Sequence, residues 1–365
     1  MVSTAQNVTP PVLSGYTYIR PLGSGGFADV YLYDQSMPRR RVAVKVLRTT
    51  DLDSEALQSF RAEANVMARV SSHPAILTIY EASISADGRP YIAMEHCQSS
   101  YRARCKSGPI PILEVLSTGV RIGGALETLH QSGLLHRDIK PSNILLTEFG
   151  LPVLADFGIA TSVESSGTDV VGMSVPWSAP EVLRESTIGT VQSEVFSFAA
   201  TIFTMVEQHS PAQIPGGDNS REAMSARVIA GRLQPITRQD VPAQLTAVLN
   251  RALSRDPRGR QQTMAELVWE FQRIEQSLGR VPTNAEVTVI SAPVDGPVGD
   301  VPKRVSVDYQ SRRPAGRPSF EAPRAEEPPS ERASSHVPWK AVVLIAVSAV
   351  AMGVIVGLSI ALWGS

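Results

Sequence analysis

The chain has 365 residues, a formal net charge of −1 and two cysteines. This length exceeds that of one small domain, and the near-neutral charge gives no indication of a nucleic-acid partner. Two cysteines in a chain of this size argue against a disulfide framework and fit a reducing compartment.

Residues 1–12 are predicted to be a short flexible leader. Met1 to Arg20 contain no apolar run of signal-peptide length, so the chain that follows is expected to stay in the cytoplasm. A glycine-rich turn follows, and glycine lets backbone N–H groups approach phosphates without obstruction. The run Val30–Tyr33 predicts a strand, which argues against a Rossmann turn leading into a helix, and no Walker Gly-Lys-Ser/Thr is present. The residues of this predicted nucleotide loop are Leu22, Gly23, Ser24, Gly25, Gly26, Phe27, Ala28 and Val30.

Alternating apolar residues predict strands over Val42–Leu47 and Tyr91–Glu95. A helix is expected between them, with Glu63 on the apolar stripe that also carries Phe60 and Met67. From residue 112 onward the patterns are mostly helical. Strands first and helices later predict an α+β architecture.

Three short motifs follow one another between residues 136 and 181. They are the octet His136–Asn143 (His-Arg-Asp-Ile-Lys-Pro-Ser-Asn), the triplet Asp156–Gly158 (Asp-Phe-Gly) and the triplet Ala179–Glu181 (Ala-Pro-Glu). Each is weak alone, but together they resemble the catalytic loop, metal-binding loop and activation-segment end of protein kinases. Over roughly residues 13–278 the chain resembles the eukaryotic-like (Hanks-type) serine/threonine kinases of bacteria, specifically the membrane-anchored, actinobacterial ones.

This resemblance implies a bilobal protein kinase fold, with a β-rich small lobe over about 13–97 and a helical large lobe over about 98–278. It also implies ATP as the cofactor, used with Mg²⁺ or alternatively Mn²⁺. Lys45 would hold the α- and β-phosphates of ATP and pair with Glu63, because a carboxylate on a buried face needs a cation. Glu95 and Cys97 would belong to the hinge whose backbone binds the adenine edge, next to Met94.

The family's catalytic roles fall on the octet and on the Asp-Phe-Gly triplet. Asp138 would accept or orient the proton of the substrate hydroxyl, and Lys140 would contact the γ-phosphate. Asn143 and Asp156 would bind the metal, whose preference for oxygen ligands suits both. The octet resembles that of Ser/Thr kinases rather than tyrosine kinases, so protein Ser/Thr side chains are the expected substrates. His136 is expected to be structural.

Regulation is expected at Arg137, which could pair with a phosphate on the activation segment. The candidate autophosphorylation sites are Ser165, Ser166 and Thr168, with Thr168 preferred and an unmodified polar loop as the alternative.

Two further contacts follow from the resemblance. Ser174 should bridge Asp138 and Lys140, and Glu181 should pair with Arg260, a buried pair that would mainly fix geometry.

The chain departs from the kinase pattern at two positions. Ala28 replaces the third glycine of the loop, and Glu194 replaces the Asp that usually receives hydrogen bonds from the catalytic loop. The extra methylene of Glu194 could shift that loop and reduce activity. The alternatives are a weakly active kinase or pseudokinase scaffold at the membrane, and a small-molecule phosphotransferase, which would not need the Ala-Pro-Glu segment.

The C-terminal part is predicted to differ in kind. Residues 279–340 are rich in Pro, poor in aromatic residues and mixed in charge, which predicts a disordered juxtamembrane linker. The 23 residues from Ala341 to Trp363 carry no charge, and as a helix they would span about 34 Å, enough for a bilayer core of about 30 Å. Lys340 at one end only predicts a cytoplasmic kinase domain on a single-pass anchor in the cell membrane, with 364–365 outside. Gly353 and Gly357 leave homodimerisation through this helix open.

Overall fold

The computed structural model describes residues 9–25, 28–48, 60, 64–65, 67–156 and 174–288. All of them belong to the first of two units, Met1–Asp295, and the second unit, Gly296–Ser365, lies entirely outside the described residues. Several predictions therefore fall outside as well. They concern Gly26, Phe27, Glu63, Phe157, Gly158, Ser165, Ser166, Thr168, most of the leader and the linker, and the predicted transmembrane helix 341–363 with its tail.

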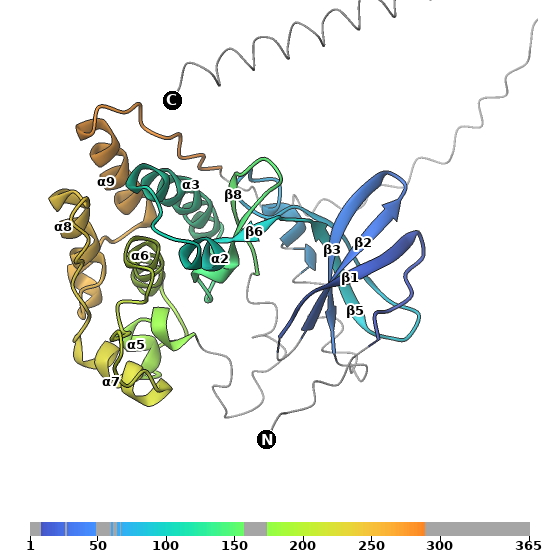
Figure 1. Cartoon of the computed structure of the whole chain (residues 1–365), viewed down its shortest axis with the longest axis horizontal. Helices are drawn as coiled ribbons and strands as arrows, with labels where there is room; N and C mark the ends of the chain where they lie inside the picture. The colour runs from blue at the N-terminus through green and yellow to red at the C-terminus, as the bar shows by residue number, and fades with distance from the viewer. Residues whose placement is uncertain are drawn as a thin grey trace, which may run out of the picture. The chain divides into compact units, whose positions relative to one another are not determined.

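The small lobe contains a five-stranded antiparallel sheet in the order β1-β2-β3-β5-β4 (Figure 1). Its strands are β1 Tyr16–Ser24, β2 Ala28–Ser36, β3 Arg39–Leu47, β4 Ile79–Ile84 and β5 Pro90–Glu95. Side chains alternate between the two faces of a strand, so Val44 and Val46 of β3 pack into one apolar cluster while Lys45 points to the opposite face. In the register, Lys45 stands between Val30 of β2 and Ile92 of β5.

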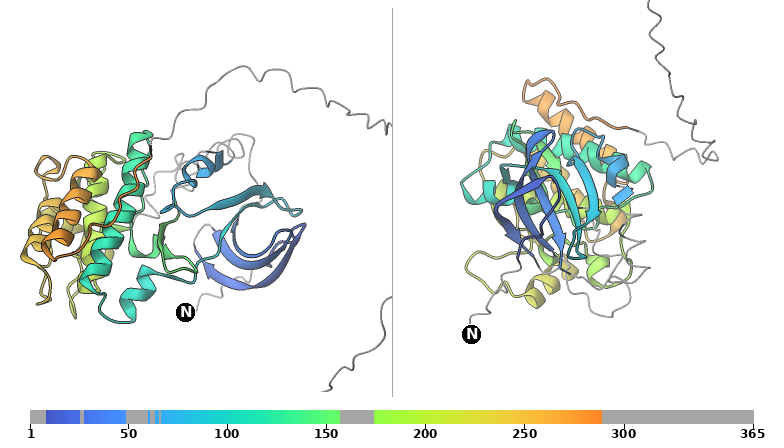
Figure 2. Two further views of the ribbon diagram at one scale, coloured as in Figure 1. Left: turned by 90° about the horizontal axis from the view of Figure 1, so that it is seen from above. Right: turned by 90° about the vertical axis from the view of Figure 1, so that its right-hand side faces the viewer.

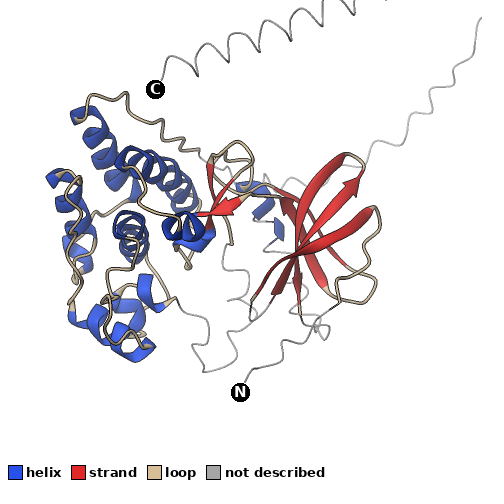
Figure 3. Ribbon diagram, viewed as in Figure 1, coloured by secondary structure: helices blue, strands red, loops and turns tan. Residues whose placement is uncertain are grey.

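The large lobe is helical and contains the largest hydrophobic core of the described residues (Figure 3). Its helices are α2 Tyr101–Lys106, α3 Ile112–Gln131, α5 Pro180–Leu183, α6 Val191–Glu207, α7 Arg221–Ala230, α8 Ala243–Ala252 and α9 Met264–Ser277. Helix α6 begins with a capping box between Thr190 and Ser193, and most of its side chains are buried. Helices α3 and α9 pack so closely that a Cβ at Gly119 would lie 2.9 Å from the Phe271 ring.

A second, three-stranded sheet lies where the two lobes meet (Figures 1 and 2). It consists of β6 Ser99–Ser100, β7 Ile144–Leu146 and β8 Pro152–Leu154, and β7 and β8 form a hairpin. Asn143 ends a short 3-10 helix, Pro141–Asn143, immediately before β7, and Asp156 follows β8. The Ala155 N–H donates to Asn143 O at 2.8 Å, so the hairpin brings the two predicted metal ligands into one neighbourhood.

The chain does not leave the large lobe at the predicted boundary. Helix α9 ends before Gly279, which has a φ of 73°, and Leu278 is 43 % exposed. Residues 280–288 then run back along α3 (Figure 2), so the described structure continues into the predicted linker. None of the helices in the described ranges is long and apolar enough to cross a membrane.

Candidate active site

His136 opens the catalytic loop as a buried structural residue. The Asp138 N–H donates to its Nδ1 at 3.3 Å, and its Nε2 donates to Ala155 O at 3.0 Å, which defines a neutral ring. Burial lowers the pKa of His136 below its ordinary value, although neighbouring carboxylates oppose this effect. His136 thus connects the catalytic loop to the segment that leads to Asp156.

The four polar residues predicted at the centre of the catalytic loop contact one another. Ser174 Oγ donates to Asp138 Oδ1 at 2.8 Å, and Lys140 Nζ donates to Ser174 Oγ at 3.0 Å and lies 2.6 Å from Asp138 Oδ2. Asn143 Nδ2 donates to the same Oδ2 at 3.0 Å and to Asp138 O at 2.9 Å. The bridge by Ser174 is the contact that the sequence predicted. A carboxylate has about four acceptor sites, so Asp138 can still accept a bond from a substrate hydroxyl.

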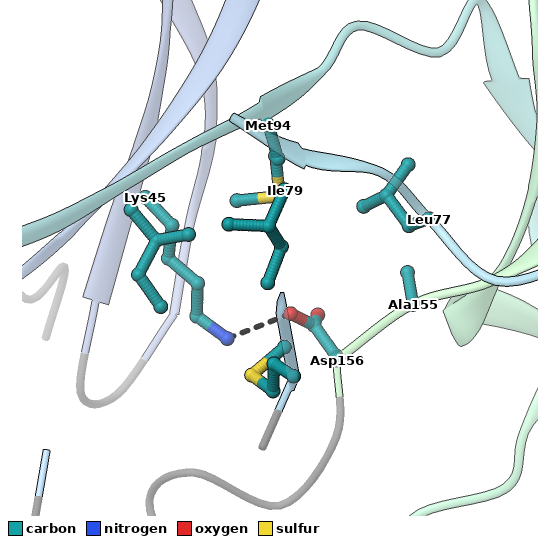
Figure 4. Close-up of a pocket in the computed structure, with 8 residues that line it drawn as sticks. Lys45, Leu77, Ile79, Met94, Ala155 and Asp156 are labelled. Carbon is teal, nitrogen blue, oxygen red and sulfur yellow. Dashed lines mark hydrogen bonds and ion pairs between the residues drawn. The ribbon is translucent and has the colours of Figure 1, made fainter. Parts of the chain in front are cut away.

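Lys45 and Asp156 form an ion pair between the two lobes (Figure 4). Their Nζ and Oδ1 atoms are 2.7 Å apart, and the side chains are 22 % and 49 % exposed. Desolvation would raise the pKa of Asp156, but the charge and hydrogen bond of Lys45, together with other neighbours that include Lys140, hold that pKa below the usual carboxyl value. Asp156 therefore stays ionised. The expected partner of Lys45, Glu63, lies outside the described residues.

The oxygen atoms near the Lys45–Asp156 pair fit a divalent cation that arrives with a nucleotide. Asp156 offers a half-exposed carboxylate, and Asn143 offers its side-chain carbonyl, which accepts a 3.3 Å bond from Ser142 Oγ. The part of the chain that the structure describes contains no group of three or more His, Cys, Asp or Glu able to hold a metal by itself. Mg²⁺ needs no such group, because it is usually bound by one or two protein oxygens together with phosphates and waters.

A pocket of mostly apolar lining lies beside this ion pair (Figure 4). It is lined by Lys45, Met67, Leu77, Ile79, Ile92, Met94, Ala155 and Asp156. Its lining combines apolar side chains with one cation and one anion, the mixture of groups that is usual in small-molecule sites. The hinge leads away from it, and the Cys97 side chain packs beside Leu77 and Ala155. Burial raises the pKa of the Cys97 thiol to about 12, so the thiol stays protonated.

The glycine-rich loop is described on both sides of its tip. Leu22, Gly23 and Ser24 end β1, while Ala28 opens β2 and accepts a bond from the Gly25 N–H at 2.9 Å. Ala28 is 8 % exposed, so the residue that departs from the glycine pattern packs inside the sheet.

Glu194, the other departure from the pattern, does contact the catalytic loop. The Arg137 N–H donates to Glu194 Oε1 at 2.6 Å, and His130 Nε2 lies 2.7 Å from Oε2. Arg137 has a φ of 65°, a conformation that is uncommon outside glycine, so this bond holds a strained backbone in place. Its side chain is exposed. His130 was not predicted from the sequence, where its position in the helical stretch shortly before the octet is the only signal.

Arg260 and Glu181 form the predicted pair in the large lobe. Arg260 Nη1 and Nη2 donate to the two Glu181 oxygens at 2.7 and 2.9 Å, in a bidentate arrangement. The Arg260 side chain is fully buried, and its other N–H groups donate to backbone carbonyls, including Ser254 O at 2.8 Å. This pair attaches the end of the activation segment to the helical core.

A second set of contacts that was not predicted from the sequence lies next to the glycine-rich loop. Arg48, just after β3, donates to Asp29 through Nε at 3.0 Å and Nη2 at 2.7 Å, and also to Ser24 Oγ. The hydrogen bonds from Arg48 hold the pKa of Asp29 below its usual value. The sequence signal for this ion pair is an Asp in one predicted strand and an Arg at the end of the neighbouring strand.

Comparisons with known proteins agree with this geometry. A family model described as "Protein kinase domain" matches residues 16–270. The chain is 38 % identical over 270 residues to the serine/threonine-protein kinase PknK of Mycobacterium bovis, covering 73 % of this chain and 24 % of PknK. It is 30 % identical over 320 residues to PknB of Mycobacterium leprae, covering 83 % of this chain and 50 % of PknB. It is 29 % identical over 269 residues to the probable serine/threonine-protein kinase CPE1738 of Clostridium perfringens, covering 72 % of this chain and 38 % of that protein. The chain thus spans about a quarter to a half of the length of these relatives.

Proposed function

Because the chain belongs to the protein kinase domain family, we propose that it transfers the γ-phosphate of ATP to Ser or Thr side chains of proteins. One observation carries the proposal: Asp138, Lys140 and Ser174 form one hydrogen-bonded group, as the reaction requires. The names of the mycobacterial and clostridial relatives, all serine/threonine-protein kinases, support the same substrate class.

Each residue of the group would have a separate task. Asp138 would orient the substrate hydroxyl and accept its proton, and Lys140 would stabilise the negative charge of the transferred phosphoryl group. Lys45 would hold the nucleotide phosphates, while Asn143 and Asp156 would hold Mg²⁺. The cation supplies charge neutralisation on the phosphates.

A transfer assay with the full-length chain tests this function. The chain is incubated with γ-labelled ATP and Mg²⁺, or Mn²⁺ in a parallel sample, and with peptides that differ only in carrying Ser, Thr or Tyr. We expect label on Ser or Thr, and its loss in Asp138→Asn. The matched control is Asp34→Asn, an exposed carboxylate of β2 that is 59 % exposed, which should leave transfer unchanged. Absence of transfer from the wild-type chain with either metal would favour a scaffold instead.

The location of the protein belongs to the proposal as well. We infer a single-pass anchor at 341–363 in the cell membrane and a kinase domain on the cytoplasmic side. The uncharged composition of that segment and Lys340 before it support this arrangement. Membrane fractionation of the full chain against a chain that stops at 340 tests it, since only the full chain should sediment with membranes.

Autophosphorylation of the activation segment is the last part of the proposal. Ser165, Ser166 and Thr168 are the candidate acceptors, and the exposed guanidinium of Arg137 would pair with the phosphate. Mass spectrometry of the chain after incubation with ATP tests this, and the absence of phosphate between 159 and 178 would contradict it.

A further inference from the structure

Residues 280–288, here named the return segment, follow α9 and run back along α3 in two views (Figures 1 and 2). The segment has no helix or strand, yet it makes hydrogen bonds at its beginning, middle and end. Backbone N–H and C=O groups that leave water need hydrogen-bond partners. The bonds of the return segment therefore indicate that it binds the large lobe in one defined position.

Thr283 is the first anchor. Its N–H donates to Glu275 Oε2 at 2.7 Å, its hydroxyl donates to Oε1 at 2.6 Å, and its carbonyl accepts from Gln272 Nε2 at 2.9 Å. Glu275 is 3 % exposed, so its carboxylate depends on such donors. Helix α9 thus carries a buried acid whose two oxygens both accept hydrogen bonds from Thr283.

The middle of the segment lies against Gly124 of α3. A Cβ at that position would be 2.7 Å from Glu286 O, which is closer than real contacts allow. The absent side chain therefore leaves the space in which the segment's backbone lies. Ala285 packs against the core of the large lobe, and the Thr288 N–H donates to Thr128 Oγ1, one turn further along α3, at 3.1 Å.

The third anchor reaches the loop before β4. His73 is buried, and its Nε2 donates to Glu286 O at 2.7 Å, because the Ala75 N–H occupies Nδ1 at 3.0 Å. From Ala75 the path continues into β8, since the Leu154 N–H donates to Ala75 O at 2.9 Å. Leu154 is two residues before Asp156. Hydrogen bonds therefore connect the return segment, through His73, to strand β8, which directly precedes Asp156.

We propose that the surface formed by Gly124, Thr128, Glu275 and His73 is an intramolecular docking site for the return segment. Docking there holds the His73 loop and thereby sets the position of Asp156 in the nucleotide site. The consequence for nucleotide binding rests on the proposed function, whereas the docking itself does not. Release of the return segment from this surface would therefore free the His73 loop.

Gly124→Ala is the variant that tests docking most directly. Alanine favours a helix over glycine, so α3 should fold at least as well, while the new methyl group clashes with Glu286 O and displaces the segment. Ala285→Asp displaces it from the other side and leaves α3 unchanged. The matched control is Ser117→Ala on the same helix, whose hydroxyl bonds to Glu114 O of that helix.

Two measurements on the full chain are expected to change together. Amide hydrogen exchange of residues 281–288 and of 71–77 should become faster in both displacing variants and stay unchanged in Ser117→Ala. Affinity for ADP with Mg²⁺ should fall about fivefold or more, at the lower end of usual coupling between sites.

Unchanged exchange of 281–288 in Gly124→Ala would overturn the docking site. Faster exchange of 281–288 with unchanged exchange of 71–77 and unchanged ADP affinity would overturn the coupling. A wild-type chain without affinity for ADP would contradict the proposed function, and the exchange of 71–77 would still decide whether the segment holds the His73 loop.

Discussion

Two ion pairs of this protein, Lys45–Asp156 and Glu181–Arg260, use similar chemistry in opposite surroundings. Lys45 and Asp156 come from different lobes and are 22 % and 49 % exposed. Arg260 is fully buried beside a Glu181 side chain that is 13 % exposed, and each guanidinium nitrogen of Arg260 has a hydrogen-bond acceptor.

This difference in exposure matches the proposed roles, because Asp156 has to exchange partners and Arg260 does not. Asp156 is proposed to bind Lys45 and Mg²⁺ alternately, and a half-exposed carboxylate is suited to this role. Arg260 gains nothing from access, because its task is to hold the end of the activation segment. A buried pair is poor evidence of stabilisation in itself, but removal of one partner leaves an uncompensated charge.

Asp156→Asn should produce the largest change and should affect activity alone. The amide keeps the size of the side chain but removes the charge that pairs with Lys45 and binds Mg²⁺. We expect phosphate transfer to fall by roughly 10³-fold or more, the scale on which one charge acts in phosphoryl transfer. The thermal midpoint should change little, since the pair is solvent-screened. A folded variant with wild-type transfer would show that Asp156 has no part in the chemistry.

Arg260→Ala should show the reverse pattern. Loss of the guanidinium leaves Glu181 without its cation and several backbone carbonyls without donors, so we expect about 3–5 kcal/mol of destabilisation. Denaturant unfolding of the full chain measures it. Arg258→Ala is the matched control, because that arginine is 91 % exposed and should cost almost nothing. Equal effects of the two substitutions would show that burial of Arg260 does not increase its contribution to stability.

The sequence predicted the contacts among Asp138, Lys140 and Ser174 better than the contacts that surround them. The octet places Asp138, Lys140 and Asn143 within one short loop, so their proximity is almost guaranteed by the chain itself. The expected Ser174 and Arg260 contacts were also found, because the motifs that carry them have fixed roles in the family that the chain resembles. The bilobal arrangement of sheet and helices followed from the order of strand and helix patterns.

The contacts that the sequence could not predict depend on tertiary packing. His130 and Glu194 are 64 positions apart and meet only because α3 and α6 pack together. The return segment is polar and contains Pro282, so its composition predicts a linker, and only the space above Gly124 shows where it lies. Composition indicates whether a segment can form a hydrophobic core of its own, but it does not indicate whether the segment can bind to a neighbouring surface.

Glu194→Asp changes a side chain that is buried like that of Arg260 but accepts a hydrogen bond from the predicted catalytic loop. The shorter side chain cannot reach both the Arg137 N–H and His130, so one donor loses its acceptor at a cost of about 1–3 kcal/mol. We expect a lower kcat with a nearly unchanged KM for ATP, because the strained loop that carries Asp138 is held less firmly. Steady-state kinetics beside thermal unfolding measures both. A higher kcat would mean that the longer glutamate limits the proposed phosphate transfer.

The smallest effect is expected at a third ion pair, Asp29–Arg48, in which the acid is buried and the arginine is partly exposed. Its hydrogen bonds lower the pKa of Asp29 in the folded chain, so the pair contributes stability above the ordinary Asp pKa of about 3.9. That contribution should be lost as the pH falls through the lowered pKa, because protonation removes the charge that Arg48 binds. Unfolding of the wild type and of Asp29→Asn, measured between neutral and acid pH, should therefore converge at low pH. A difference that stays constant with pH would show that Asp29 contributes through packing rather than through its charge.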